Sequence, residues 1–340
     1  MSLALNLDAV ELESQIRVLG TGICLPPARP VREIAAAAGA DVSAYQGWDN
    51  VCLARETDHP SSMGAAALRA ALADSGIAAG DLKLVIFAGI SRDYLPSFSV
   101  ATEIMKDCGA SNRCLGIDLT IGCLGALSGL DFAQGWLAVH GGGLAAVVGA
   151  ERWSQTVDRS SVASMGLWAH GDGAGAVVVG MDAAPSAKAV FIGAETTTAS
   201  DLNGLVLVKY GGTRYPVAPP GSNPSERIFL GVDRRDEIRD RYVKGYTRAY
   251  AALRDRFGIF PDQVVCNQTA AQFVQLIAHV YQMPPDRVVI TGRETGHVGS
   301  ADLLVGLDRL LKPAPLTEPC LLAGSTPYAF GCGLLMPSRA

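Results

Sequence analysis

Several features that would reveal a function directly are missing from this 340-residue sequence. Its eight cysteines include no Cys-x-x-Cys pair, so we expect neither a zinc site nor a redox dithiol. No apolar run approaches the ~20 residues that a membrane-spanning helix requires. Charged residues make up 18% of the chain and the net charge is -5, so we expect no basic surface for nucleic acid or anionic lipid.

The N-terminal stretch also lacks the features of a secretory leader. Residues 1–18 have no basic start and carry acidic residues where a signal peptide would be apolar. We therefore expect a soluble, cytoplasmic protein whose cysteines are mostly free, small and buried. The length is sufficient for one large domain or two fused ones with a substantial core.

Apolar runs of strand length alternate with helical patterns and glycine-rich turns along the whole chain. This alternation predicts an α/β fold. The clearest predicted strands cover residues 16–24, 82–90 and 114–121, and the clearest helices cover residues 61–76 and a segment from about Leu124.

An internal repeat is the most informative pattern. Gly122-Cys123-Leu124-Gly125 and Gly296-His297-Val298-Gly299 each follow a predicted strand and precede an apolar helix that contains Gly-Leu-Asp. The second copy is three residues longer. Such a repeat predicts two related halves, residues 1–181 and 182–340, packed around a pseudo-twofold axis. Cys123 and His297 would then occupy equivalent helix starts and face each other.

Residues 206–231 have no counterpart in the first half. The segment is rich in turn-forming residues and mixes aromatic side chains with arginines. It is either a lid or binding loop, or a plain surface loop.

Cys123, His297 and Asp302 together suggest acyl transfer. A thiol at a helix N-terminus meets free backbone N–H groups, which favour the thiolate and can stabilise an oxyanion. A histidine within reach completes the activation of a nucleophile. Asp302 lies five residues after His297, where its carboxylate could accept the second imidazole N–H and orient the ring.

Each of these residues also has a purely structural interpretation. A single cysteine in an apolar helix is usually core, a single histidine is usually a satisfied core or surface residue, and Asp302 could be a first-turn acid favoured by the helix dipole. The internal repeat favours the catalytic interpretation, because it ties two reactive residue types to related positions.

Three segments give the chain a family resemblance: IGCLGALSGLDFA (121–133), VVGAERWS (147–154) and GDGAGAVVVG (171–180). Together they resemble 3-oxoacyl-ACP synthase III of the thiolase superfamily, over nearly the whole chain. The resemblance implies a five-layered αβαβα thiolase fold made of two pseudo-twofold related halves, and a homodimer. It also implies an acyl-enzyme on the cysteine, an acyl donor carried by coenzyme A or acyl carrier protein, and no cofactor.

Two positions depart from the family pattern. Condensing members have a histidine where this chain has Asn267, and an asparagine where it has His297, so the two residues have exchanged places. In the condensing enzymes that pair holds the thioester carbonyl while malonyl loses carbon dioxide. The exchange, with Asp302 added, resembles the branch that transfers acyl groups without condensing them in polyketide and antibiotic pathways. The enzyme that malonylates a cervimycin sugar is of this kind.

The resemblance assigns a role to each candidate residue. Cys123 is the nucleophile, His297 the base and Asp302 its orienting acid. Asn267 would donate a hydrogen bond to a carbonyl or to the acceptor. The oxyanion hole would combine the N–H of Cys123 with that of Gly331, for which Gly333 competes.

Three further residues are candidates for substrate binding. Trp48 and Arg55 lie where the family grips coenzyme A, although Trp48 could simply pack. His170 replaces a residue that is usually apolar, so it either lines the site or is structural.

The expected reaction is transfer of an acyl group to a hydroxyl, such as a sugar of a polyketide glycoside. Malonyl is the acyl group suggested by analogy, since no arginine in the sequence is marked as a carboxylate ligand. One alternative is a starter-unit condensing enzyme that tolerates the exchanged pair. Another is a catalytically silent partner of a synthase, although such subunits lack the cysteine.

Overall fold

A computed structural model describes residues 15–95, 97–182, 187–223 and 226–338. Residues 1–14, on which the expectation about a leader mainly rests, lie outside the described residues. So do residues 224–225 of the segment that has no counterpart in the first half.

Two five-stranded sheets form the framework, and β1 and β8 join them into one ten-stranded ladder. The first has the order β5-β4-β6-β7-β1 and the second β8-β14-β13-β11-β12. The strands of the first are β1 (Ile16–Cys24), β4 (Leu82–Phe87), β5 (Leu115–Asp118), β6 (Gly143–Arg152) and β7 (Asp172–Met181). Those of the second are β8 (Ala189–Thr198), β11 (Gln263–Cys266), β12 (Val288–Val289), β13 (Cys320–Thr326) and β14 (Ala329–Met336).

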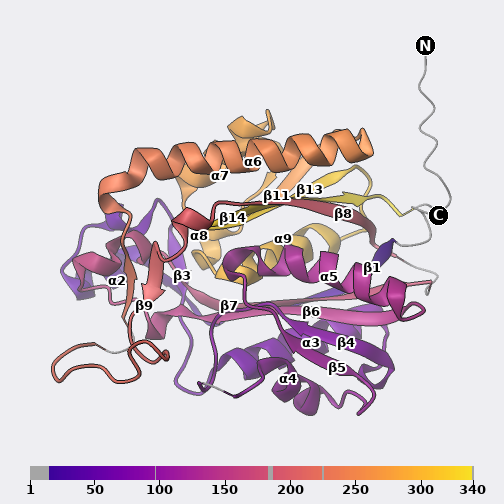
Figure 1. Ribbon diagram of the computed structural model, residues 1–340, viewed down its shortest axis with the longest axis horizontal. Helices are drawn as coiled ribbons and strands as arrows, with labels where there is room; N and C mark the ends of the chain where they lie inside the picture. Colours follow the sequence, from indigo (N-terminus) through magenta and orange to yellow (C-terminus); the bar gives the residue numbers. More distant parts are fainter. Residues whose placement is uncertain (1–14, 96, 183–186, 224–225, 339–340) are drawn as a thin grey trace.

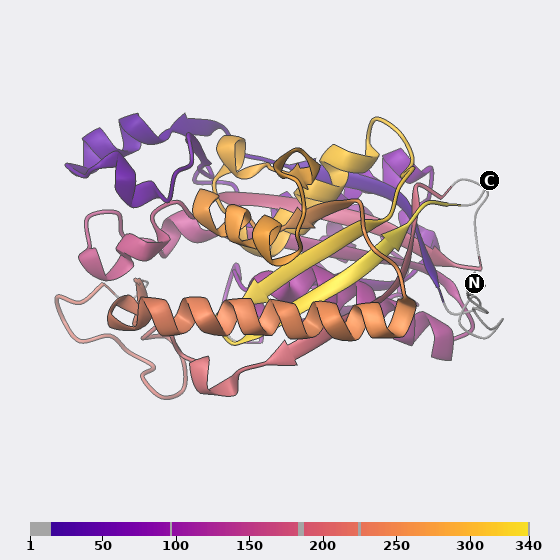
Figure 2. The same cartoon turned by 90° about the horizontal axis from the view of Figure 1, so that it is seen from above.

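Helices cover both outer faces and fill the space between the sheets, which makes five layers (Figure 1). The outer pairs are α3 (Pro60–Ser75) with α4 (Val100–Cys108), and α6 (Arg235–Phe257) with α7 (Ala271–Val280). The middle pair is α5 (Gly125–Val139) and α9 (Asp302–Leu311). Figure 2 shows α6 running along the second sheet. The expected αβαβα thiolase fold is confirmed.

The strand pairing is the same in both halves. In the first, β4 pairs parallel with β5 and β6, and β7 is antiparallel to β6 and β1. In the second, β11 pairs parallel with β12 and β13, and β14 is antiparallel to β13 and β8. The two middle helices therefore occupy corresponding places, since each connects a parallel edge strand to the strand two places inward.

The main core lies around the middle helices, which have apolar residues on several faces because a sheet covers them on each side. Leu127, Leu130, Leu304 and Leu307 are at most 1% exposed there. Burying each such side chain stabilises the fold by about 1.5–3 kcal/mol. The helix starts are thus held firmly, and the candidate site is built on them.

Smaller elements surround this framework. They are α2 (Val31–Ala38), α8 (Gly292–Thr295), the pair β2 (Ala28–Pro30) and β3 (Asn50–Cys52), and the pair β9 (Val206–Val208) and β10 (Arg227–Phe229). The last pair belongs to the segment without a counterpart, and its connecting loop protrudes at the lower left of Figure 1.

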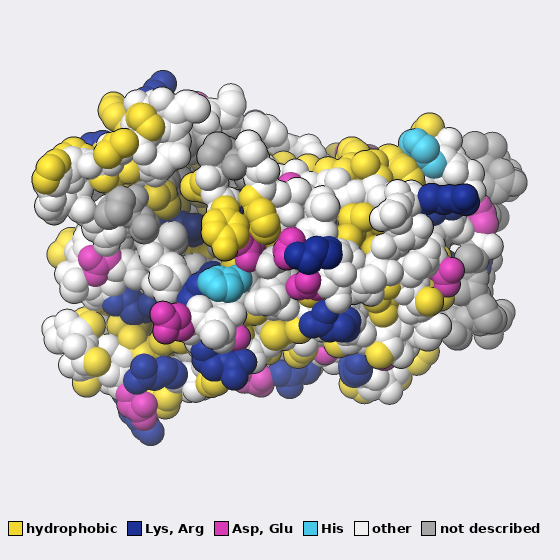
Figure 3. Space-filling view, turned by 90° about the horizontal axis from the view of Figure 1, so that it is seen from below, with side chains coloured by type: hydrophobic (Ala, Val, Ile, Leu, Met, Phe, Trp, Pro, Cys, Tyr) yellow, Lys and Arg dark blue, Asp and Glu magenta, His cyan; other side chains and the backbone are white. Residues whose placement is uncertain are grey.

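The surface shows mixed charge. On the face drawn in Figure 3, acidic and basic side chains are interspersed. Within the described ranges, no helix is both long and apolar enough to cross a membrane.

Candidate active site

Cys123 lies in a single 3-10 turn, Gly122–Leu124, between β5 and α5. Gly122 has a φ of +61°, a conformation that costs other L-residues about 1–2 kcal/mol. A Cβ atom at this glycine would also come within 2.8 Å of Thr326 Cγ2. The glycine before the cysteine therefore allows both the turn and its close packing against the end of β13.

The structure corrects the expected equivalence of Cys123 and His297. A second 3-10 turn, Gly299–Ala301, leads directly into α9, as Gly122–Leu124 leads into α5. Gly299 repeats the backbone of Gly122, with a φ of +60°. Ser300 is thus the counterpart of Cys123, and the three extra residues of the second copy place His297 in the loop before the turn.

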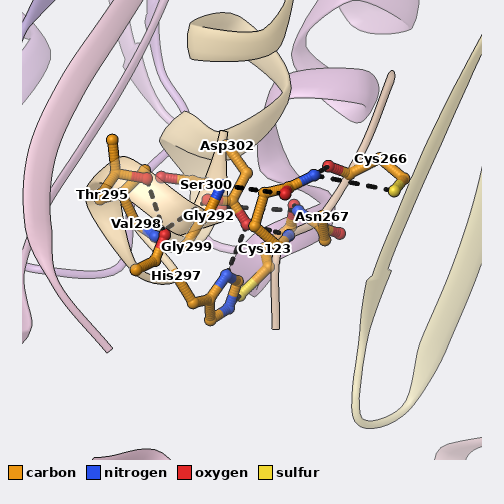
Figure 4. Close-up of polar contacts among 12 residues, drawn as sticks. Cys123, Cys266, Asn267, Gly292, Thr295, His297, Val298, Gly299, Ser300 and Asp302 are labelled. Atoms are coloured by element: carbon orange, nitrogen blue, oxygen red, sulfur yellow. Dashed lines mark hydrogen bonds and ion pairs between the residues drawn. The ribbon is translucent and has the colours of Figure 1, made fainter. Parts of the chain in front are cut away.

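His297 nevertheless faces the cysteine (Figure 4). Its Nε2 atom lies 3.3 Å from Cys123 Sγ, and its Nδ1 atom lies 2.5 Å from Asp302 Oδ2. The backbone of His297 is held on both sides, by donation to Ala169 O at 2.9 Å and acceptance from Gly171 N at 2.8 Å. Sulfur, imidazole and carboxylate therefore form a continuous line of contacts.

Asp302, the first residue of α9, is 1% exposed and fully occupied as an acceptor. Besides the ring of His297, it accepts the backbone N–H groups of Gln268 at 2.6 Å and Val298 at 2.9 Å. Three donors fix the carboxylate in place, and the carboxylate in turn fixes the ring orientation of His297.

The charges around His297 favour its protonated form. Burial of the ring opposes protonation, but the Asp302 carboxylate and the Cys123 sulfur outweigh it and raise the pKa of His297 to about 10. At neutral pH the ring therefore carries both protons, one toward Asp302 and one toward Cys123.

Asn267 does not present its amide to the cavity. The side chain is fully buried, and its Nδ2 group donates to the carbonyl oxygens of Cys123 at 3.2 Å and Gly299 at 3.5 Å. Its Oδ1 atom accepts from Ser325 N at 2.7 Å. This corrects the expected role as a donor to substrate, because both amide protons are engaged with the protein backbone.

Gly331 is not at the cavity either. It lies inside β14, in register with Gly324 of β13 and Thr196 of β8, so neighbouring strands surround its backbone. The chain instead reaches the cavity at the turn between β13 and β14, residues 325–328. The assignment of Gly331 to an oxyanion hole is corrected accordingly.

The two residues expected to grip coenzyme A lie elsewhere. Trp48 is 5% exposed and donates its indole N–H to Gln268 O at 2.9 Å, and its ring packs in the core against Gly292 of α8. Arg55 is an exposed side chain paired with Asp58. Neither lines the cavity that holds Cys123.

His170 does line that cavity, beside His297. The two residues form a parallel backbone bridge, and their ring centroids are 4.7 Å apart. Burial, with the charge of His297 second, lowers the pKa of His170 well below its usual value, so the ring is neutral. Its Nδ1 atom has no hydrogen-bond partner among the described residues.

The cavity itself has a volume of about 550 Å³ and a mainly apolar lining. Cys123 and His297 line it together with residues of β9, β10 and the start of α6. The segment that is absent from the first half therefore contributes to the binding site.

Sequence reasoning missed two cavity residues, Trp153 and Arg227. Trp153 stands within the family segment 147–154, and its ring centroid is 5.2 Å from that of His297. Arg227 begins β10, in the segment that the sequence already marks as rich in arginines and aromatics. An arginine opening a short apolar run in that segment is the signal that could have identified it.

In the described part of the chain, no cluster of three or more histidine, cysteine or acidic side chains could hold a metal ion. The site brings together a half-buried thiol, a buried imidazole and a buried carboxylate.

Comparisons with known proteins support the fold and its class. The family description "3-Oxoacyl-[acyl-carrier-protein (ACP)] synthase III" matches residues 117–199, which include Cys123. The β-ketoacyl-[acyl-carrier-protein] synthase III of Oleidesulfovibrio alaskensis is 29% identical over 260 residues, covering 75% of this chain and 76% of that protein. The synthase III of Microcystis aeruginosa is 27% identical over 285 residues, covering 81% and 80%.

Solved structures share the same architecture. A variant of Xanthomonas campestris OleA superposes with a TM-score of 0.82 at 20% identity, covering 95% of this chain and 98% of that one. The 3-oxoacyl-(acyl carrier protein) synthase III of Xanthomonas oryzae superposes with a TM-score of 0.81 at 20% identity, with the same coverage.

These matches make the chain similar to synthase III proteins, in sequence and in overall fold.

Proposed function

We propose that the protein transfers an acyl group from a coenzyme A or carrier-protein thioester to a hydroxyl acceptor, through a thioester on Cys123. The observation that carries the proposal is the line of contacts from Cys123 through His297 to Asp302, at 3.3 Å and 2.5 Å. A nucleophile, a base and an orienting carboxylate in this order are the components of acyl transfer.

The first step loads the enzyme. The Cys123 thiolate attacks the carbonyl carbon of the donor thioester, the new carbon–sulfur bond forms, and the bond to the donor sulfur breaks. His297, protonated at neutral pH because of its raised pKa, gives its Nε2 proton to the departing thiolate. The products of this step are a neutral acyl-cysteine, a neutral ring and the free thiol carrier.

The second step transfers the acyl group. Acylation removes the negative charge of Cys123, which is one of the causes that raise the pKa of His297, so the ring becomes a competent base. Nε2 takes the proton of the acceptor hydroxyl as its oxygen attacks the thioester. Cys123 leaves as the thiolate, and the initial ion pair is restored.

The contacts of Asn267 support transfer without condensation. In condensing relatives a histidine and an asparagine together hold the thioester carbonyl. Here the asparagine amide bonds the backbone of Cys123 and Gly299, and His297 is tied to a carboxylate. This arrangement suits His297 to accept a proton from a hydroxyl. It does not provide the histidine–asparagine pair that holds the thioester carbonyl during condensation.

We place the acceptor hydroxyl on a natural-product sugar, following the resemblance to non-condensing tailoring enzymes. A cavity of about 550 Å³ with a mainly apolar lining can accommodate a group of that size beside the acyl chain. Enzymes of the synthase III type act on acyl-CoA or acyl-ACP and need no cofactor. A homodimer is part of the same proposal.

A condensing synthase is the second candidate, because the sequence relatives at 27–29% identity carry that name. The two functions differ in their products. Condensation of a malonyl unit releases carbon dioxide and makes a carbon–carbon bond, whereas transfer makes an ester and releases none.

Intact-mass analysis against a panel of acyl-CoA donors, followed by a chase with methyl glycosides or with malonyl-loaded carrier protein, tests the proposal. We expect a covalent acyl mass on the wild-type chain, none on Cys123→Ala, and an ester product from the glycoside chase. Carbon dioxide release coupled to a β-ketoacyl product would establish the condensing function instead.

A further inference from the structure

Arg227 brings a buried positive charge to the active-site cavity. The residue is 7% exposed, and it lines the cavity together with Cys123 and His297. Its guanidinium carbon lies 4.2 Å from the centroid of the Trp153 ring, whose centroid lies 5.2 Å from that of His297. A single aromatic side chain thus contacts both the guanidinium and the proposed base.

No acidic side chain forms an ion pair with Arg227 within the described ranges, although the charges of Glu151 and Cys123 act on it from a distance. The Nη1 atom of Arg227 is buried without a hydrogen-bond partner among the described residues. Arginine stays protonated even in buried positions, so the charge cannot be removed by titration. A buried, unpaired charge is costly, and a ligand of opposite charge would offset that cost.

The carboxylate of Glu151, whose charge acts on Arg227, is already engaged in hydrogen bonds to other groups. Its carboxylate accepts from the indole N–H of Trp153, the hydroxyl of Ser300, and both the N–H and hydroxyl of Ser91. It also accepts the N–H of Ile90. Its charge acts on Arg227 from a distance, but no hydrogen bond joins them.

We propose that Arg227 binds the free carboxylate of a dicarboxylic acyl group carried on Cys123, so that the donor is a carboxyacyl thioester of the malonyl type. The planar fork of a guanidinium matches a carboxylate through two parallel hydrogen bonds. Arg227 and Cys123 line the same cavity, and the guanidinium stacks on Trp153, so the carboxylate of an acyl group on the sulfur would extend toward it. This proposal rests on the proposed function.

The same contact explains how a carboxyacyl group would keep its carboxylate. Loss of carbon dioxide moves the negative charge from the carboxylate to the neighbouring carbon. A guanidinium that pairs with the carboxylate stabilises the ground state more than the transition state of that loss, and so slows it. Transfer of the intact group to a hydroxyl is then the favoured outcome.

Two donors of matched shape test the proposal on the full chain. Isovaleryl-CoA has methyl groups where malonyl-CoA has its two carboxylate oxygens. The rate of Cys123 acylation from each is measured by intact mass for the wild type, Arg227→Met and Arg227→Lys. We expect Arg227→Met to lower the malonyl rate about 10- to 100-fold, the size of a lost charge-assisted hydrogen-bond pair, and to leave the isovaleryl rate nearly unchanged.

Arg254→Met is the matched control. Arg254 is also an arginine stacked on an aromatic ring, 4.1 Å from the centroid of Phe260, but it is exposed and lies outside the cavity. This variant should keep the wild-type ratio of malonyl to isovaleryl rates, and Arg227→Lys should fall between the wild type and Arg227→Met.

The possible results separate the two proposals. Equal loss of both rates in Arg227→Met, or a wild type that takes both donors equally, would overturn the role of Arg227 while leaving acyl transfer intact. A wild-type chain that accepts no acyl group from any thioester would overturn the proposed function, and this inference with it.

Discussion

The side-chain amide of Asn267 donates to the carbonyl oxygen of Cys123 at 3.2 Å, although 144 residues separate them in the chain. Its own carbonyl accepts from Ser325 N at 2.7 Å. One buried amide therefore ties the turn that carries the nucleophile to the end of β13. Asn267 is a positioning residue for the sulfur.

Replacement of Asn267 by alanine should destabilise the protein and misplace Cys123 together. The change leaves the Cys123 carbonyl and the Ser325 N–H buried without partners, each at a cost of about 1–3 kcal/mol. The Tm and the rate of Cys123 acylation, measured by intact mass, should both decrease. Unchanged stability with slower transfer alone would instead indicate that the amide acts on substrate.

Gly122→Ala should slow acylation and destabilise the fold by more than the backbone strain of about 1–2 kcal/mol. The added Cβ atom would lie 2.8 Å from Thr326 Cγ2, so the turn must move. Gly109→Ala is the control, because Gly109 has a φ of +74° but no atom within 4 Å of the added Cβ. Equal unfolding free energies for the two variants would contradict the close-packing argument.

Cys123→Ala should abolish the acyl-enzyme and lower turnover by about 10³-fold or more, since the nucleophile of a covalent mechanism is removed. The measurements are intact mass after exposure to acyl-CoA and product formation under multiple turnover. Cys24→Ala serves as control, because that half-buried thiol lies outside the cavity. Retention of the acyl mass in Cys123→Ala would contradict the assignment of Cys123 as the nucleophile.

Asp302→Asn should slow transfer from the acyl-enzyme by about 10²-fold or more, because the ring loses the partner that fixes its tautomer. The carboxylate also raises the pKa of His297, so the variant should lower that pKa. Single-turnover transfer and the carbon-13 chemical shift of the ring against pH measure the two effects. An unchanged transfer rate would reduce Asp302 to a helix-start acid.

Protonation of His297 should make stability depend on pH. Its pKa is raised to about 10 from the usual 6.5, so the stabilisation is complete below pH 6.5 and is lost as the pH rises through about 10. The Tm difference between the wild type and His297→Gln should therefore be larger at pH 6 than at pH 10. An exposed control, His140→Gln, should follow the wild-type profile; a flat difference for His297→Gln would contradict the raised pKa.

Local sequence signals predicted the framework and the grouping of Cys123, His297 and Asp302. Strand-length apolar runs predicted β1, β4 and β5, and the helix expected at residues 61–76 is α3. The position of Cys123 at a helix start could be predicted, because the turn and the helix depend only on residues close to it in the sequence. His297 and Asp302 are only five residues apart, so their contact could also be predicted from the sequence.

The internal repeat alone does not decide which residue of the second half corresponds to Cys123. Aligning the two Gly-X-apolar-Gly motifs pairs Cys123 with His297. Aligning the two Gly-Leu-Asp motifs instead pairs Cys123 with Ser300. Both registers predict that the two halves face each other. Only the backbone conformation, with Gly122 and Gly299 near the same positive φ, decides between them.

By itself, the sequence determined the alternation of strands and helices, the thiol at a helix start, and the imidazole with its carboxylate, because each depends on periodicity or on neighbours a few residues away. The layered arrangement was implied by the family resemblance. The tertiary structure alone decided that Asn267 serves the backbone, that Trp48 packs in the core, that Gly331 lies within a sheet and that Arg227 enters the cavity. Those outcomes depend on which distant segments pack together and on whether a polar group is left buried without a partner, and no local pattern of residues encodes either.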